Sequence, residues 1–248
     1  MTAHFMNVLR QAFKTFDRAN HASFNANLQH LKQLTDELTY RDLHIKEELF
    51  RPHAGASSPS HAQGRAPCSY MHIFEDERFS MSLFIVRGSS SIPLHDHPMM
   101  FGLLRCIWGK LLVQSYTQQL GPDEPLHYDT DPIVVKVNVE EPCLVSPDTP
   151  SAMVTPRKRN YHHITEAGNG VAAFFDILSP PYDADMPMYG PRSCRFYRPK
   201  SDGGQTQLHC IPSPATYYCD VVDTPKTVLQ CAFKCADEDY AENVPETQ

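Results

Sequence analysis

From residue 68 onward the sequence consists of short runs of β-branched, aromatic and aliphatic residues separated by proline, glycine, serine and aspartate. No convincing helical pattern interrupts this stretch. Its clearest runs are FSMSLFIV (79–86), KLLVQSYT (110–117), IVVKVNV (133–139) and VAAFFDIL (171–178). Many evenly spaced short strands predict an all-β core folded as a sandwich or barrel.

Two amphipathic helices are predicted ahead of this β region. Apolar residues recur at steps of three to four over residues 3–18 and again over 23–38, as they do along one face of a helix. Ser23 is a suitable N-cap for the second helix. We therefore expect the N-terminal segment 1–50 to cover one face of the β domain.

Composition indicates the remaining boundaries. Residues 51–67 are rich in alanine, serine, glycine and proline, which is typical of a linker or long loop. The β domain is then predicted to span 68–236, with a proline- and tyrosine-rich loop at 180–225 and a last strand or short helix at 227–236. Residues 237–248 form an acidic tail that we expect to be disordered.

Charge and cysteine usage exclude several classes of protein. With 22 Lys+Arg against 29 Asp+Glu, the net charge of −7 argues against a nucleic-acid or anionic-membrane partner. No run reaches the roughly 18 apolar residues of a membrane span. The eight cysteines are scattered without a CxxC pair, as in a reducing compartment. We predict a cytoplasmic monomer; the nucleus and mitochondrial import stay open, because the N-terminal helix is amphipathic and lacks acidic residues before Asp17.

The histidines carry the first functional signal. His95 and His97 lie two residues apart in a β-like segment, so both side chains point to one face while Asp96 points to the other. Pro98 then ends regular pairing, which places the pair at a strand end. Such a pair is either the start of a metal site or two surface histidines.

A third histidine favours the metal site. His162 is central in the run NYHHIT, where it would face inward and His163 outward. One HxH pair followed by a late single histidine resembles the two-part metal motif of the cupin superfamily, which implies a double-stranded β-helix barrel. Most cupins add a glutamate four or five positions after the pair, where this chain has Phe101 and Gly102. Three neutral imidazoles would leave bound Fe²⁺ its full charge and an open face for a thiolate and O₂.

Three motifs in order extend this resemblance. IPLHDHPMMFGLL, NYHHI and FFDILSPPYDAD together resemble the cysteamine dioxygenase and plant cysteine oxidase family over roughly residues 5–200. The resemblance implies that His95, His97 and His162 bind Fe(II), and that Asp176 and Tyr182 act at the substrate pocket. From the residues alone, Asp176 could equally make a turn hydrogen bond at a strand end, and Tyr182 could be a packed loop tyrosine.

The chain departs from the family pattern in two places. Animal members carry a cysteine followed two positions later by a tyrosine, and the two can cross-link. Here Cys194 matches the cysteine, but Phe196 takes the second position and Tyr197 follows one residue later, so we expect no cross-link. Met99 replaces a glycine and Phe101 a polar residue, which predicts a bulkier, more apolar pocket lip.

The resemblance implies oxidation of a 2-aminoethanethiol unit to the sulfinate with O₂. Free cysteamine and a peptide with N-terminal cysteine both contain this unit, and oxidation of the peptide would make an oxygen sensor that feeds an N-degron pathway. The main alternative is a metal-binding cupin without oxygenase activity, for storage or sensing. A cupin isomerase or sugar-binding module is disfavoured by the missing glutamate and by the absence of a basic cluster within the motifs.

Overall fold

The computed structural model describes residues 2–17, 21–51, 66–88, 90–121, 123–126, 134–168, 170–184 and 190–243, so most of the expected linker lies outside the described residues. The helices are α1 (Ala3–Phe16), α2 (Phe24–Asp36) and α3 (Lys226–Asn243), with 3-10 turns η1 (His21–Ser23) and η2 (Glu47–Phe50). The strands are β1 (Cys68–Glu75), β2 (Ser80–Arg87), β3 (Ser91–Asp96), β4 (Phe101–Trp108), β5 (Leu111–Gln118), β6 (Val134–Val139), β7 (Cys143–Val145), β8 (Ala152–Val154), β9 (Tyr161–Glu166), β10 (Val171–Ser179), β11 (Phe196–Asp202), β12 (Gln205–Ile211) and β13 (Cys219–Val221).

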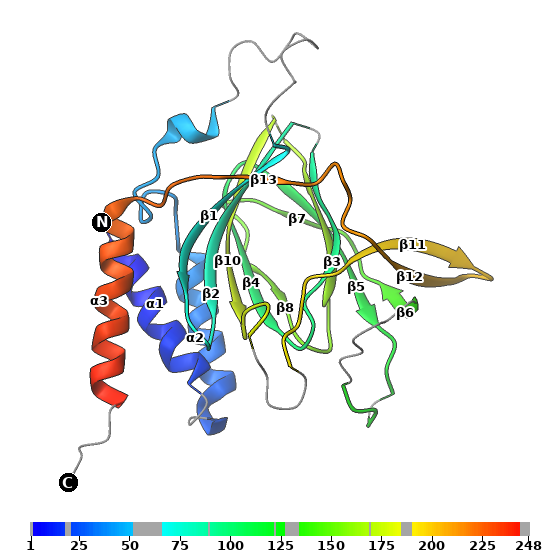
Figure 1. The fold of residues 1–248 in the computed structure, drawn as a ribbon, viewed down its shortest axis with the longest axis horizontal. Coiled ribbons are helices and arrows are strands. Elements are labelled where there is room, and N and C mark those ends of the chain that lie inside the picture. Colours follow the sequence, from blue (N-terminus) through cyan, green and yellow to red (C-terminus); the bar gives the residue numbers. More distant parts are fainter. Residues whose placement is uncertain are drawn as a thin grey trace.

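The strands form two facing sheets (Figure 1). The first sheet has the order β13-β1-β2-β10-β4-β8, and the second has the order β6-β12-β11-β3-β9-β5-β7. Strand β6 also pairs with β5, so the second sheet curls back on itself. Except for the parallel β1–β13 pair, neighbouring strands run antiparallel. The predicted all-β core with N-terminal helices is confirmed. Among the described residues, no helix has the length and apolar character required to traverse a bilayer.

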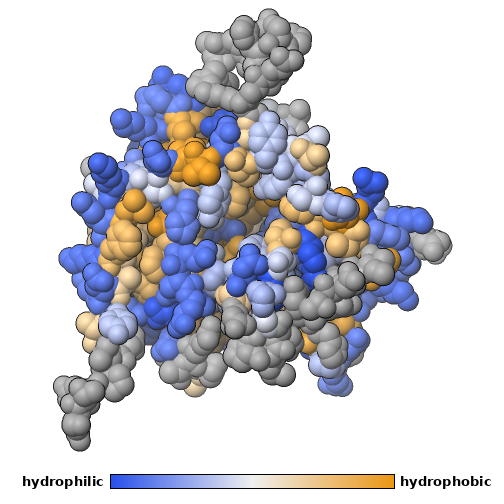
Figure 2. Space-filling view, in the orientation of Figure 1, coloured by the Kyte–Doolittle hydropathy of each residue, from blue (hydrophilic) through white to orange (hydrophobic). Residues whose placement is uncertain are grey.

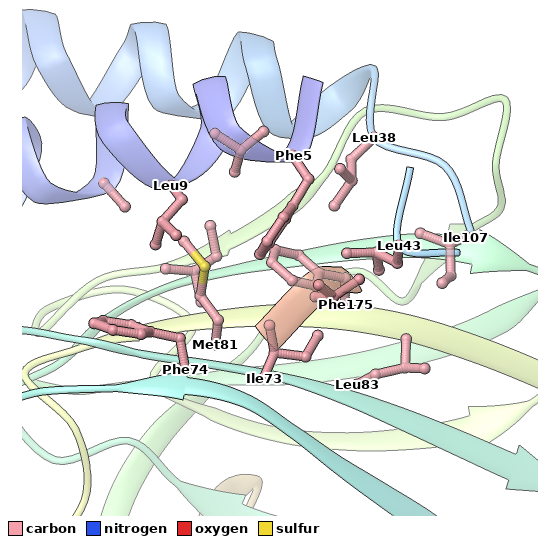
Figure 3. Packing of buried hydrophobic residues seen from close by; sticks show 14 of the residues in the cluster. Phe5, Leu9, Leu38, Leu43, Ile73, Phe74, Met81, Leu83, Ile107 and Phe175 are labelled. Atoms are coloured by element: carbon pink, nitrogen blue, oxygen red, sulfur yellow. The ribbon is translucent and has the colours of Figure 1, made fainter. Parts of the chain in front are cut away.

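The helices pack on the outer face of the first sheet. Helix α1 lies between α2 and α3, which is drawn in red beside it, and α3 also contacts β1 of the sheet (Figure 1). Phe5 and Leu9 of α1 point toward Met81 and Phe175 of the sheet, in a cluster that excludes water (Figure 3). Burial of such side chains is worth roughly 1.5–3 kcal/mol each relative to exposure, which holds the helical layer on the barrel.

Strand β10 connects this core to the interior of the barrel. All nine of its residues are buried, because the helices cover one face and the second sheet covers the other. Since alternate side chains of a strand point to opposite faces, Phe175 and Ile177 meet the helices while Phe174 and Asp176 face the inside. The alternation thus explains how a carboxylate in a continuous apolar run reaches the barrel interior.

The predicted loop over 180–225 is wrong from residue 196 onward. Strands β11 and β12 form a hairpin there, and β13 adds to the edge of the first sheet. Gly203 and Gly204 supply the turn, with φ of 55° and 86° that other residues adopt only at a cost. The hairpin was missed because its strands lack an apolar run: most of their side chains are polar and at least partly exposed.

The expected disordered tail is also wrong for the part that the structure describes. Residues 237–243 are the last turns of α3, and 244–248 lie outside the described residues. Glu238 forms an ion pair with Arg10 of α1 at 2.9 Å, and Asp239 forms one with Arg78 at 2.8 Å. The acidic residues that suggested disorder therefore form ion pairs that hold α3 against α1 and the turn between β1 and β2.

Candidate metal centre

The structure brings the three predicted histidines together inside the barrel. His95 on β3 is the direct partner of His162 on β9, and His97 follows the end of β3. Ring centroids are 4.7 Å apart for His95–His162 and His97–His162, and 4.9 Å apart for His95–His97. Their ligand nitrogens all lie within 4.8 Å of one another. Three imidazoles, from β3, from the residue after its end and from β9, therefore face one point, as the spacing predicts.

Burial keeps these imidazoles neutral. It lowers the pKa of His95 to about 4 and the pKa values of His97 and His162 well below their ordinary range. A neutral imidazole has one nitrogen lone pair available for a metal. His95 Nδ1 lies 2.8 Å from the Pro93 carbonyl oxygen, to which it can only donate, so its Nε2 is the free ligand.

Tyr182 determines the tautomer of His97. Its hydroxyl lies 2.6 Å from the Asp96 carbonyl oxygen and 2.9 Å from His97 Nδ1. The single hydroxyl proton is donated to the carbonyl, because the carbonyl can only accept. The hydroxyl oxygen then accepts the Nδ1–H of His97, which leaves Nε2 free, 3.0 Å from His162 Nε2. Tyr182 thus lies at the site, where it contacts a histidine directly.

Asp96 points away from the histidines, as the strand alternation predicts, yet it is buried. Its carboxylate accepts hydrogen bonds from the backbone N–H of Arg195 at 2.8 Å, from Arg195 Nε at 3.1 Å and from the Tyr197 hydroxyl at 2.9 Å. A carboxylate with these partners anchors the strand that carries both His95 and His97. Asp96 therefore supports the site from behind, a role that sequence reasoning missed.

Arg192 and Asn160 were also missed. The fully buried Arg192 guanidinium donates to the carbonyl oxygens of Pro98 at 2.7 Å and Pro181 at 2.9 Å, which joins the turn after His97 to the turn before Tyr182. The side-chain amide of Asn160 donates a hydrogen bond to the His97 backbone carbonyl oxygen at 2.5 Å. The backbone carbonyl oxygen of Asn160 accepts one from the His97 backbone N–H at 2.9 Å. Short sequence patterns give no signal for contacts of this kind, which join segments far apart in the chain.

Asp176 lies in the same cavity as the three histidines. This cavity of about 280 Å³ lies between the two sheets. Burial raises the pKa of Asp176 to about 7. A second, smaller pocket is also lined by His97, His162 and Asp176. The structure therefore places Asp176 at the site; its catalytic role, like that of Tyr182, stays a prediction.

The departures from the family pattern have distinct structural consequences. Phe196 lines the cavity, while the Tyr197 hydroxyl is held by Asp96 on the opposite face of β11. Cys194 lies beside Tyr182 in the cavity wall, and Phe196 occupies the position two residues after it, so the expectation about the cross-link stays a prediction. Phe101 packs against Phe24 of α2 at 4.9 Å, and it does not line the cavity, so the expected effect on the pocket lip is wrong for this residue.

Met99 adopts the left-handed backbone conformation that favours glycine, with φ of 62°. This accounts for the glycine that the family has at this position. Met99, like Phe101, is absent from the residues lining the cavity, so its size does not narrow the pocket.

The donor set suits a divalent transition metal. Within the described part of the chain, the cluster offers three imidazole nitrogens and no carboxylate. Imidazole is a good ligand for iron, zinc, copper and nickel, and three protein ligands leave coordination positions open for other molecules. Two of the three rings have their second nitrogen hydrogen-bonded, as is usual for metal-binding histidines.

Comparison with known proteins finds a family to which this chain is similar. The PCO_ADO family profile matches residues 34–236. The 2-aminoethanethiol dioxygenase of Mus musculus is 31% identical over 220 residues, covering 80% of this chain and 80% of that protein. The 2-aminoethanethiol dioxygenase of Homo sapiens is 32% identical over 195 residues, covering 71% of this chain and 66% of that protein. Plant cysteine oxidase 1 of Arabidopsis thaliana is 27% identical over 157 residues, covering 62% of this chain and 50% of that protein.

Proposed function

Because this chain belongs to the PCO_ADO family, a cupin family, we propose that it is a non-haem Fe(II) thiol dioxygenase. Its substrate is a 2-aminoethanethiol unit, which it oxidises to the sulfinate. The observation that supports this proposal most is the buried cluster His95, His97 and His162, whose imidazoles are neutral and have no carboxylate among them. Among its relatives are proteins named for 2-aminoethanethiol and for cysteine oxidation.

The three imidazoles would hold the iron through their Nε2 atoms. When bound, Fe(II) lowers the pKa of a coordinating thiol and supplies the electron-transfer chemistry that lets O₂ react with it. Tyr182 holds the His97 ring in the correct tautomer, and the apolar cavity walls exclude water. Both atoms of O₂ end on the sulfur, so the thiol itself supplies the electrons and no further reductant is required.

Asp176 would recognise the amine of the substrate. It is the one carboxylate among the described residues that line the cavity. An ammonium beside a buried carboxylate favours the charged forms of both groups, which offsets the burial that raises the pKa of Asp176. Thiol at the histidines and amine at Asp176 together define the 2-aminoethanethiol unit.

That unit occurs in free cysteamine and in the N-terminal cysteine of a peptide. Oxidation of an N-terminal cysteine would mark a protein for an N-degron pathway, and the rate of marking would follow the supply of O₂. We include this oxygen-sensing role in the proposal, as an extension of the same chemistry.

The proposal is tested by anaerobic reconstitution with Fe(II), followed by isotopically labelled O₂ and either cysteamine or a peptide with N-terminal cysteine. Mass spectrometry should find two labelled oxygen atoms on the sulfur. An apo sample and a zinc-loaded sample serve as controls and should be inactive. A protein that binds metal tightly but takes up no O₂ with either thiol would instead be the storage or sensing cupin.

A further inference from the structure

The cavity extends well beyond the histidines. Its volume is about 280 Å³, whereas a dry apolar cavity of about 150 Å³ is enough for a benzene ring. Cysteamine has fewer non-hydrogen atoms than benzene. With a thiol and amine held between the histidines and Asp176, a large part of the cavity would stay unfilled by cysteamine alone.

One part of the cavity wall is aromatic. Phe84 on β2 and Phe174 on β10 are direct cross-strand partners whose rings stack at 5.2 Å. Phe196 on β11 packs against Tyr217 at 5.7 Å. These four side chains, here called the aromatic subsite, line the cavity together with Ile92 and Ile164. In the space-filling view, apolar residues gather near the middle of the molecule, where the surface is recessed between the sheets (Figure 2).

The aromatic subsite begins next to the candidate metal centre. The Phe196 ring is 6.5 Å from the His95 ring, and the two residues are partners in the β11–β3 pairing. In a peptide, the Cα of the second residue is 3.8 Å from that of the first. A cysteine thiol at the histidines therefore brings the next side chain against this wall. No lysine, arginine or glutamate is found among the described residues that line the cavity.

We propose that the aromatic subsite receives the second residue of a peptide with N-terminal cysteine and selects an apolar, preferably aromatic, side chain there. This inference rests on the proposed function and adds a specificity that the proposed function leaves open. Burial of an apolar side chain favours binding, whereas a charged side chain in the same place would lose water without gaining a partner.

Tyr217 is the member of the subsite best suited to a test. It lies between β12 and β13, where its backbone N–H donates to the Pro214 carbonyl oxygen at 2.9 Å, so its ring is presented from a turn rather than from a sheet. Its hydroxyl accepts a hydrogen bond from the Cys219 thiol at 3.7 Å. The next residue, Tyr218, is 53% exposed and does not line the cavity, which makes it a matched control.

The experiment measures kcat/KM of the Fe(II)-loaded protein for peptides that differ only at the second residue: phenylalanine, leucine, serine, glutamate or lysine. For the wild type we expect about a tenfold preference for phenylalanine over serine, the ratio that corresponds to partial burial of an aromatic ring. Tyr217→Ala should reduce this ratio to about threefold or less, whereas Tyr218→Ala should keep it. Tyr217→Glu should raise the rate for lysine relative to glutamate, because it adds a negative charge to the subsite.

Cysteamine, assayed alongside, separates the two proposals. A wild-type protein that oxidises cysteamine and all five peptides at similar kcat/KM overturns the aromatic subsite and leaves the proposed function standing. A wild-type protein that oxidises no thiol overturns both. An unchanged phenylalanine-to-serine ratio in Tyr217→Ala also overturns the assignment. If the alanine variant does not fold, Tyr217→Glu tests the assignment instead, and an unchanged lysine-to-glutamate ratio in that variant overturns it.

Discussion

Tyr182 and the Pro93 carbonyl each hold one nitrogen of a neighbouring histidine. Because His95 and His97 donate from Nδ1, both rings present Nε2 to the same point. A metal site depends on such supporting hydrogen bonds almost as much as on the ligands themselves. The contact between Tyr182 and His97 therefore gives this tyrosine a structural reason to be at the site that is independent of any contact with substrate.

Replacement of Tyr182 by phenylalanine tests that role. Tyr182→Phe removes the hydroxyl that accepts the His97 Nδ1–H, so the ring loses its orientation, and we expect metal affinity to fall by roughly tenfold or more. Anaerobic Fe(II) titration against a competing chelator measures the change. Tyr218→Phe, at an exposed position, should bind as the wild type does. Equal affinity of Tyr182→Phe and wild type would show that the contact does not support the site.

Asp176 makes the stability of the metal-free protein depend on pH. Burial raises its pKa from 3.8 to about 7, so its ionisation is harder in the folded than in the unfolded chain. The stability that this group contributes is present below about pH 4 and is lost as the pH rises through about 7. Asp176→Asn cannot ionise and should escape this loss.

Relative to the wild type, metal-free Asp176→Asn should therefore gain about 3 kcal/mol in free energy of unfolding between about pH 5 and pH 8. Urea denaturation across this pH range measures the difference in free energy of unfolding. The contributions of the buried histidines to this difference cancel, because both proteins have the same histidines. A difference between the two proteins that does not change with pH would mean that Asp176 titrates near its ordinary pKa in the folded state.

At the scale of elements, β10 and α3 differ in how much the sequence reveals. The run 171–178 predicts its strand, because all of its residues are buried and most are apolar. The sequence predicts the first part of α3 as either a strand or a short helix over 227–236, and its last turns were missed because of their acidic residues, whose partners Arg10 and Arg78 lie in distant segments. Strands β11 and β12 were hidden because their polar side chains suggest a loop. Local pattern thus predicts elements stabilised by burial and misses those stabilised by long-range ion pairs or an exposed hairpin.

The docking of α3 can be tested at two adjacent positions. Ala232 is 2% exposed and belongs to the core between α3, α1 and the first sheet, whereas Phe233 is 65% exposed. Ala232→Asp places an unpaired charge in that core and should destabilise the protein by about 3 kcal/mol or detach the helix. Phe233→Asp should be close to neutral. Thermal unfolding, with hydrogen exchange of α3, separates these outcomes; equal effects of the two variants would contradict the packing.

At the scale of the whole molecule, the candidate site joins four segments that are far apart in sequence. The spacing of His95 and His97 and the alternation around His162 predict the histidine cluster, and the structure brings its members together. Asp96 and Arg192 were not predicted, because their hydrogen bonds reach residues about 95 to 100 positions away or join two loops through backbone carbonyls. The aromatic subsite was missed for the same reason: its four members lie on four different parts of the chain.

The central claim is that three histidines form one iron site for thiol oxidation, and two adjacent residues test it most directly. His162 is buried among the ligands, whereas His163 points to the other face of β9 and is partly exposed. After anaerobic loading with Fe(II), bound iron and sulfinate formation are measured on the same samples with cysteamine and a peptide with N-terminal cysteine. His162→Ala should lose the iron and the product, while His163→Ala should retain both. Full iron binding and turnover in folded His162→Ala would contradict the account.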